Sequence, residues 1–150
     1  ILSRVLSKVA DEYDVILIDC QPSLGLLTVN ALTAAHGVII PLETEFFALR
    51  GVALLVETIE KIQDRLNPSL VVDGILATMF DSRPLHSKEV MSRVTEAFDD
   101  KVFETVINRT VKFPDASVAA EPITSFAPKH AGSEAYRRLA RELIARGGAP

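Results

Sequence analysis

Two hydrophobic periods alternate along this chain of 150 residues, and the alternation constrains the fold more than any other feature. Short runs that are almost entirely apolar occur at Val15–Ile18 and Val38–Pro41, and two more lie within Leu70–Phe80 and Val102–Ile107. A strand that is apolar on both sides is typical of a parallel sheet covered by helices on both faces. The sequence therefore predicts four buried strands.

Amphipathic segments separate these runs. Apolar residues recur at helical spacing within Leu2–Val9, Leu24–Ala35, Val52–Leu66, Ser87–Phe98 and Ser133–Ile144. Because strands and helices alternate, we predict an α/β fold with a mainly parallel sheet flanked by helices and joined by right-handed crossovers. The length suits a single α/β domain over residues 1–150.

The composition argues against several classes of protein. The apolar runs are far shorter than the roughly 18 residues of a membrane span, and no secretory leader follows Ile1, so we expect no membrane association. A single cysteine, Cys20, excludes an internal disulfide and fits a reducing cytoplasm. The three histidines lack the spacing of zinc ligands. The net charge is −4, so any contact with nucleic acid must come from a local patch or from several copies acting together.

In an open parallel sheet, ligands bind beyond the carboxyl ends of the strands. Asp19 directly follows the first run, where a carboxylate could hold Mg²⁺ through water, although aspartate is also common in ordinary loops at this place. Glu43 and Glu45 follow the second run, and a solvated turn is the favoured interpretation there. Phe46 and Phe47 are expected in the core.

Three cations follow the third and fourth runs: Arg83, Arg109 and Lys112. The two loops would share one rim of the sheet, and basic side chains gathered on one edge suit phosphate groups. Three ordinary surface cations remain an equal alternative at this point. The sequence contains no GxxxxGK[ST], GxGxxG or GxSxG, so it has no recognisable phosphate cradle or serine-hydrolase motif.

Longer stretches of the sequence resemble the ParA/Soj-type partition ATPases. Tyr13–Gly25 is similar to the Walker B segment of that family, and the similarity continues in order through Asn30–Ala35, Thr78–Asp81 and Pro122–Ala140. It extends over nearly the whole chain. The resemblance implies a P-loop NTPase-like fold of the deviant Walker type, truncated at the N-terminus so that the phosphate-binding loop is absent.

The resemblance also implies an activity. Members of the family couple ATP binding to homodimer formation, and the dimer binds DNA without sequence preference in the cytoplasm, on the nucleoid. ATP hydrolysis, stimulated by a centromere-binding ParB-type partner, releases the DNA. The complete protein would therefore be an ATPase of chromosome or plasmid partitioning, whereas we expect this chain alone to lack catalysis because the GxxxxGK[ST] loop is missing.

The same resemblance assigns residues around ATP and Mg²⁺. Asp19 matches the catalytic Walker B carboxylate that holds Mg²⁺ through water, and Met79, Asp81 and Asn108 match positions near the adenine. Gln21 and Asn108 each replace a proline that is common in relatives, which changes the two loops without removing the charge of Asp19.

For DNA, Arg83 and Lys112 match contact positions of the family, and Arg109 lies close to them in sequence. Lys112 stands where relatives often carry arginine, so the charge is kept and the bidentate fork is lost. Two alternatives stay open: a non-catalytic α/β interaction module, and a septum-positioning ATPase of the same superfamily. Septum-positioning ATPases usually end in an amphipathic membrane helix, and here only Arg146–Pro150 follow the last helix.

One further expectation concerns the sheet. By resemblance, the strand that leads into the missing loop lies between the Val15–Ile18 and Val38–Ile40 strands. We expect either that these two strands pair directly or that another copy of the chain supplies the missing contacts.

Overall fold

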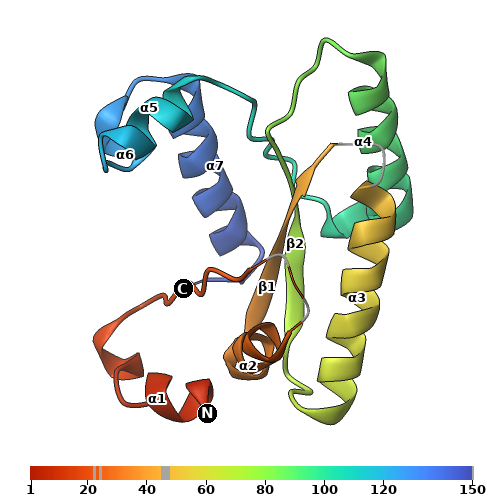
Figure 1. The fold of residues 1–150 in the computed structure, drawn as a ribbon, viewed down its shortest axis with the longest axis vertical. Helices are drawn as coiled ribbons and strands as arrows, with labels where there is room; N and C mark the ends of the chain where they lie inside the picture. The colour runs from red at the N-terminus through yellow and green to blue at the C-terminus, as the bar shows by residue number, and fades with distance from the viewer. Residues whose placement is uncertain (22, 24, 45–47, 150) are drawn as a thin grey trace.

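The structure is a computed structural model that describes residues 1–21, 23, 25–44 and 48–149. Its elements follow one another along the chain as Figure 1 shows. They are α1 (Leu2–Leu6), η1 (Ala10–Glu12), α2 (Leu26–Ala34), β1 (Gly37–Glu43), α3 (Ala48–Arg65), β2 (Val71–Thr78), α4 (Leu85–Phe98), η2 (Asp99–Lys101), α5 (Lys112–Val118), α6 (Ile123–Phe126) and α7 (Ala131–Ala145).

A parallel pair of strands, β1 and β2, forms the centre of the molecule. The register runs from Gly37 opposite Val71 to Glu43 opposite Thr78, with one irregularity after Val38. At that point Asp73 has no partner on β1, because β2 carries one residue more than β1 over the paired region. The helix α3 makes the crossover between the two strands, as expected for parallel neighbours.

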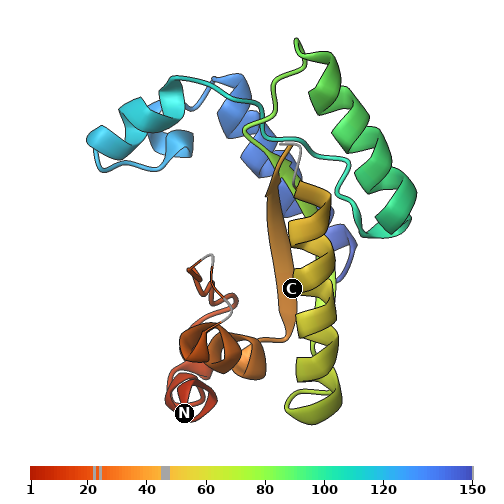
Figure 2. The same cartoon turned by 45° about the vertical axis from the view of Figure 1, so that its right-hand side comes forward.

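Helices cover both faces of this pair, which explains why the strands are apolar at successive positions. Ile40 and Ile75 pack in one core with residues of α2, α3 and α4. Their neighbours Ile39 and Leu76 point the other way and pack against α7. Figures 1 and 2 show α3 and α4 on one side of the strands and α7 on the other. The expected α/β fold with a parallel sheet flanked by helices is therefore confirmed.

The fourth apolar run lies beside β2 but forms no continuous strand. Parallel bridges join Val102 to Ile75 and Asn108 to Phe80. Between them, the amide of Phe103 donates to Ile75 O and the amide of Ile107 donates to Ala77 O, both at 2.9 Å. Four residues of this segment thus span the same distance as two residues of β2. The surplus backbone bulges out of the ladder, so the prediction of a regular strand over 102–107 is wrong.

The first apolar run departs further from its prediction. Val15–Ile18 has no strand structure, and Val15 and Leu17 are 48% and 82% exposed. Figure 2 shows this part of the chain standing away from β1. A strand forms only where a neighbouring backbone pairs with it, and within the described residues β1 pairs with β2 alone. The prediction of a buried first strand is therefore wrong. Of the two alternatives for the gap, direct pairing with Val38–Ile40 is not found, and contacts supplied by another copy stay a prediction.

The helices agree with the periodic pattern more closely than the strands do. At the last helix, the cap is His130, whose ring accepts from the amide of Gly132 at 3.0 Å, so the helix begins two residues earlier than predicted. The buried hydroxyl of Ser133 instead donates to the carbonyls of Ile123 and Ala127, which fastens α6 to α7. The short helices α5 and α6 had no predicted counterpart. Leu24 and the segment 45–47, which include predicted helix and core positions, lie outside the described residues.

Of the helices that the structure describes, none combines the length and the apolar character needed to cross a lipid bilayer.

Candidate functional site

The end of β2 and the end of the fourth apolar run meet at one edge of the sheet. The amide of Phe80 donates to Ile107 O at 3.1 Å, and the amide of Arg109 donates to Phe80 O at 3.0 Å. These two bonds hold the loops that follow each segment side by side. Between the loops lies a hollow of about 310 Å³, near the lower end of the range for small-molecule sites. Its lining residues are Phe80, Asp81, Ser82, Arg83, Asn108 and Arg109.

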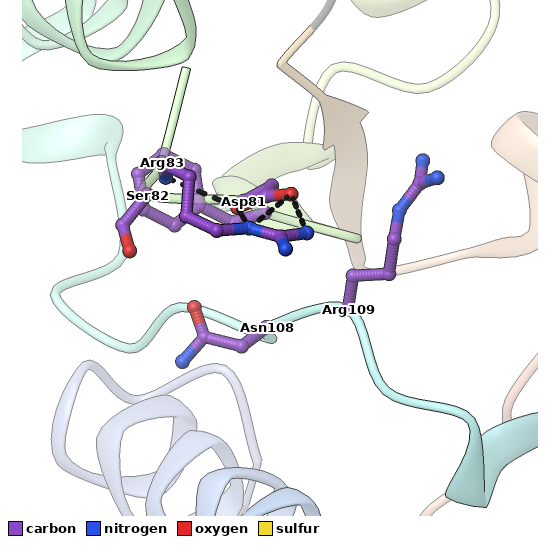
Figure 3. A pocket seen from close by; sticks show the side chains of 6 residues that line it. Asp81, Ser82, Arg83, Asn108 and Arg109 are labelled. Carbon is purple, nitrogen blue, oxygen red and sulfur yellow. Dashed lines mark hydrogen bonds and ion pairs between the residues drawn. The ribbon is translucent and has the colours of Figure 1, made fainter. Parts of the chain in front are cut away.

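Asp81 and Arg83 are joined to each other at the mouth of this hollow, as Figure 3 shows. Arg83 Nε lies 2.9 Å and 3.1 Å from the two carboxylate oxygens, and Nη2 lies 2.6 Å from Oδ2. The backbone amide of Arg83 also donates to Oδ1 at 3.0 Å. These hydrogen bonds, the side-chain ones first, lower the pKa of Asp81 to about 2. Asp81 is therefore an anion at neutral pH.

Asn108 and Arg109 come from the opposite loop. In Figure 3 the Asn108 amide extends from that loop on the far side of the hollow from Asp81, and the Arg109 side chain turns away from it. Arg109 Nη2 donates to Glu43 Oε1 at 2.8 Å, so the guanidinium reaches across the sheet edge to the last residue of β1. The hollow thus offers an amide that both donates and accepts, a carboxylate and the Arg83 guanidinium, while the Arg109 guanidinium is turned toward Glu43.

Met79 precedes the hollow without lining it. Its φ of +50° places a non-glycine residue in the left-handed region, which is uncommon and costs about 1–3 kcal/mol when the surroundings hold it there. β2 ends at Thr78, and the turn at Met79 brings Phe80 into position to form an isolated parallel bridge with Asn108. The expected place of Met79 beside a base stays a prediction.

Lys112 lies outside the hollow, at the first residue of α5. Its ammonium group is 3.0 Å from Asp115 Oδ2 and 6.0 Å from the centroid of the Phe126 ring. Lys112 follows Arg109 by three positions in the chain, so these two of the three expected rim cations are near neighbours in sequence. The structure brings Arg83 and Arg109 into one hollow and leaves Lys112 on the adjoining helix.

Asp19 is exposed and follows the unpaired Val15–Ile18 segment. It does not line the hollow, and no group of three or more His, Cys, Asp or Glu side chains that could hold a metal occurs in the described part of the chain. A single carboxylate is still compatible with Mg²⁺, because this ion usually keeps several waters and takes only one or two protein ligands.

The sequence did not predict that the three cations would form ion pairs. Their partners are Asp81 for Arg83, Glu43 for Arg109 and Asp115 for Lys112. The pair Lys112–Asp115 has the three-residue spacing of neighbours on a helix and could have been found once α5 was recognised. The pair Arg109–Glu43 joins residues 66 positions apart, and no local pattern predicts it.

Residues 1–72 match a family model described as an AAA domain. An uncharacterized protein of Mycobacterium tuberculosis is 63% identical over 98% of this chain and 46% of its own length. The chromosome-partitioning ATPase Soj of Treponema pallidum is 48% identical over 98% of this chain and 58% of its own length.

Among solved structures, a crystal structure of cobyrinic acid a,c-diamide synthase from Mycobacterium smegmatis with bound ADP and magnesium superposes with a TM-score of 0.79. The two sequences are 39% identical, and the match covers 98% of this chain and 53% of that one. The chain spans about half the length of the curated relatives it matches.

Proposed function

The chain belongs to the ParA/Soj family of chromosome-partitioning ATPases, and we propose that the protein is an ATPase that binds DNA without sequence preference during chromosome or plasmid partitioning. The observation that carries the proposal is the 48% identity to Soj, which extends over 98% of the chain. Similarity of this extent includes the sheet edge with its hollow as well as the segment around Asp19.

ATP and Mg²⁺ are the proposed cofactors, in keeping with the ADP and magnesium bound to the Mycobacterium smegmatis protein. Asp81 and Asn108 could hydrogen-bond a base, since together they provide acceptors and amide donors. Asp19 would hold Mg²⁺ through water, and the ion would offset negative charge on the phosphates during transfer. No GxxxxGK[ST] loop occurs in the sequence of this chain, so the residues present fit the base and the metal better than the phosphates.

Arg83, Arg109 and Lys112 are the proposed DNA contacts. Arg83 is 87% exposed and Arg109 and Lys112 are about half exposed, so phosphate groups of a duplex could reach all three. Contacts of this kind read the backbone and carry no direct sequence information, which supports binding without sequence preference. The net charge of −4 makes a single copy a weak DNA ligand, and a homodimer would double the number of cations presented.

The remaining elements of the proposal follow from the family. A centromere-binding ParB-type protein is the proposed partner that stimulates hydrolysis. A cytoplasmic, nucleoid-associated location is proposed together with DNA binding.

Replacement of Asp19 with alanine tests the ATPase. In the full gene product, Asp19→Ala should abolish ATP turnover while the circular dichroism spectrum stays unchanged, because an exposed side chain contributes little to the core. Asp14→Ala, which removes the same charge from an exposed position five residues earlier, is the control. Turnover near the wild-type rate in Asp19→Ala would show that the Walker B assignment is wrong.

Replacement of the cations tests DNA binding. With Mg-ATP present, Arg83→Ala and Lys112→Ala should each weaken binding to two unrelated duplexes equally, and each should reduce the salt slope by about one. Lys61→Ala is the control, because Lys61 is an exposed, ion-paired lysine on α3. A loss confined to one duplex, or no loss beyond the control, would contradict the proposed contacts. A protein with ATP turnover and no DNA binding would favour a synthase of the kind named for the Mycobacterium smegmatis structure.

A further inference from the structure

Each of the three rim cations, Arg83, Arg109 and Lys112, is paired with a carboxylate of the same chain. Arg83 contacts Asp81 at 2.6 Å, Arg109 contacts Glu43 at 2.8 Å, and Lys112 contacts Asp115 at 3.0 Å. The three carboxylates come from three different parts of the chain: the loop after β2, the end of β1, and α5. One rim therefore presents three ion pairs in place of three free cations.

A carboxylate and a phosphate compete for the same donors. Two oxygens of Asp81 accept from the Nε and Nη2 atoms of Arg83 in a side-on arrangement, which is also how a guanidinium holds two phosphate oxygens. Arg83 cannot give the same Nε and Nη2 hydrogens to a carboxylate and to a phosphate at once. Arg109 and Lys112 each give one hydrogen bond to their carboxylate, at 2.8 Å and 3.0 Å, so the carboxylate occupies one donor and offsets the positive charge.

We propose that Asp81, Glu43 and Asp115 act as internal competitors of DNA phosphate that set the strength and the salt dependence of DNA binding at this rim. The inference rests on the proposed DNA-binding function and adds the residues that regulate it. DNA must displace a carboxylate to take the donors that it holds, and at Arg109 and Lys112, where other donors stay free, the carboxylate still offsets the charge that attracts phosphate. Since exposed ion pairs are weak, each displacement lowers the affinity by a modest factor of about two to five. The arrangement keeps binding reversible and confines it to conditions in which several cations engage together.

The pair Lys112–Asp115 offers the cleanest test, because neither residue lines the hollow proposed for the nucleotide. The affinity of the full gene product for a nonspecific duplex is measured by fluorescence anisotropy with Mg-ATP over a series of NaCl concentrations. Asp115→Asn should tighten binding about two- to fivefold. Glu57→Gln is the matched control, because it removes one exposed negative charge from the i,i+4 partner of Lys61 on α3. A gain no larger than that of Glu57→Gln would overturn the proposal.

A double-mutant cycle separates competition from the general effect of charge. In a Lys112→Ala background, Asp115→Asn should give no gain beyond that of Glu57→Gln in the same background, because the cation that it frees is absent. An equal gain in both backgrounds would overturn the competition, since only net charge would then matter. Glu43→Gln and Arg109→Ala form a second, independent cycle with the same expected result.

The experiments distinguish failure of the proposed DNA binding from failure of the proposed competition by carboxylates. If Arg83→Ala, Arg109→Ala and Lys112→Ala all leave DNA binding unchanged, the rim does not contact DNA, and the proposed function fails together with this inference. If they weaken binding while Asp115→Asn and Glu43→Gln give no specific gain, the cations contact DNA and the competition alone is wrong.

Discussion

Replacement of Glu142 with alanine should detach the segment before the hollow from α7. The Glu142 carboxylate accepts hydrogen bonds from the backbone amides of Glu104 at 2.8 Å and Thr105 at 3.0 Å. It also accepts from Arg146 Nη2 at 2.8 Å, and Arg146 in turn donates to Asp100 O and Val102 O. These are the residues at which the fourth apolar run bulges out of the ladder beside β2. Glu142 therefore takes the place of a strand partner.

The expected loss follows from the donors that Glu142 satisfies. Thr105 is only 2% exposed, so its amide would be left without a partner, at about 1–3 kcal/mol. The amide of Glu104 is on an exposed residue and can bond to water, so its loss adds about 1 kcal/mol. Glu142→Ala should therefore lower the free energy of unfolding by about 2–4 kcal/mol. Glu142→Gln keeps one acceptor oxygen and should cost about half as much.

Urea denaturation followed by circular dichroism measures the change. Glu134→Gln is the control, because Glu134 lies on the same helix, carries the same charge and forms exposed ion pairs with Arg137 and Arg141. The control should remain close to the wild type, since exposed pairs contribute little. If Glu142→Ala were no more destabilising than Glu134→Gln, Glu142 would not be holding the segment, and the reasoning would be refuted.

The pH dependence gives a second measurement on the same residue. Burial of the Glu142 carboxyl raises its pKa, but the hydrogen bonds from Thr105, Glu104 and Arg146 outweigh burial and leave the pKa below its ordinary value. A carboxyl with a lowered pKa stabilises the fold above the unfolded-state value, about 4.3, and this contribution is lost as the pH falls through the folded-state pKa. The difference in stability between the wild type and Glu142→Gln should therefore be constant from pH 7 to pH 5 and shrink below pH 4.

Three more predictions follow from the rest of the molecule. Gly74→Ala should destabilise the protein by about 1–3 kcal/mol in thermal unfolding, because the new Cβ would lie 2.5 Å from Cε2 of the Phe103 ring. The control is Gly51→Ala on α3, which should be neutral or stabilising because nothing lies within 4 Å of the new Cβ. The 150-residue chain by itself should bind Mg-ATP weakly or not at all, since it has no GxxxxGK[ST] loop, and micromolar affinity by calorimetry would contradict this. Light scattering at micromolar concentration should show association of the chain through its exposed Val15–Ile18 segment, and Leu17→Asp should reduce it; a monomeric wild type would show that this segment needs no partner.

Much of the architecture was predictable from local patterns. Val38–Pro41 and the apolar part of Leu70–Phe80 became β1 and β2, and the helical period located α3, α4 and α7 to within a few residues. The location of the candidate site at one edge of the sheet was also predictable, because the carboxyl ends of neighbouring parallel strands lie on the same side. For this reason Arg83 and Arg109 were expected together before their shared hollow was seen.

The two wrong strand predictions have a common physical origin. Val15–Ile18 has the composition of a buried strand, but a strand also requires a backbone beside it, and composition does not report whether one is there. The run Val102–Ile107 has a neighbour in β2, yet α7 competes for its amides through Glu142, which lies 37 residues beyond Thr105. In both segments a distant part of the molecule decided the outcome.

The sequence by itself determined the class of fold, its longer helices, the family, and the residues whose function is to be tested. These depend on periodicity and on short motifs, which act over a few neighbouring positions. Only the tertiary structure decided which apolar runs became strands and which carboxylate each rim cation contacts, as Arg109 and Glu43 illustrate across 66 residues. Pairing of backbones and of charges depends on distances in space, and those distances are set when the whole chain packs.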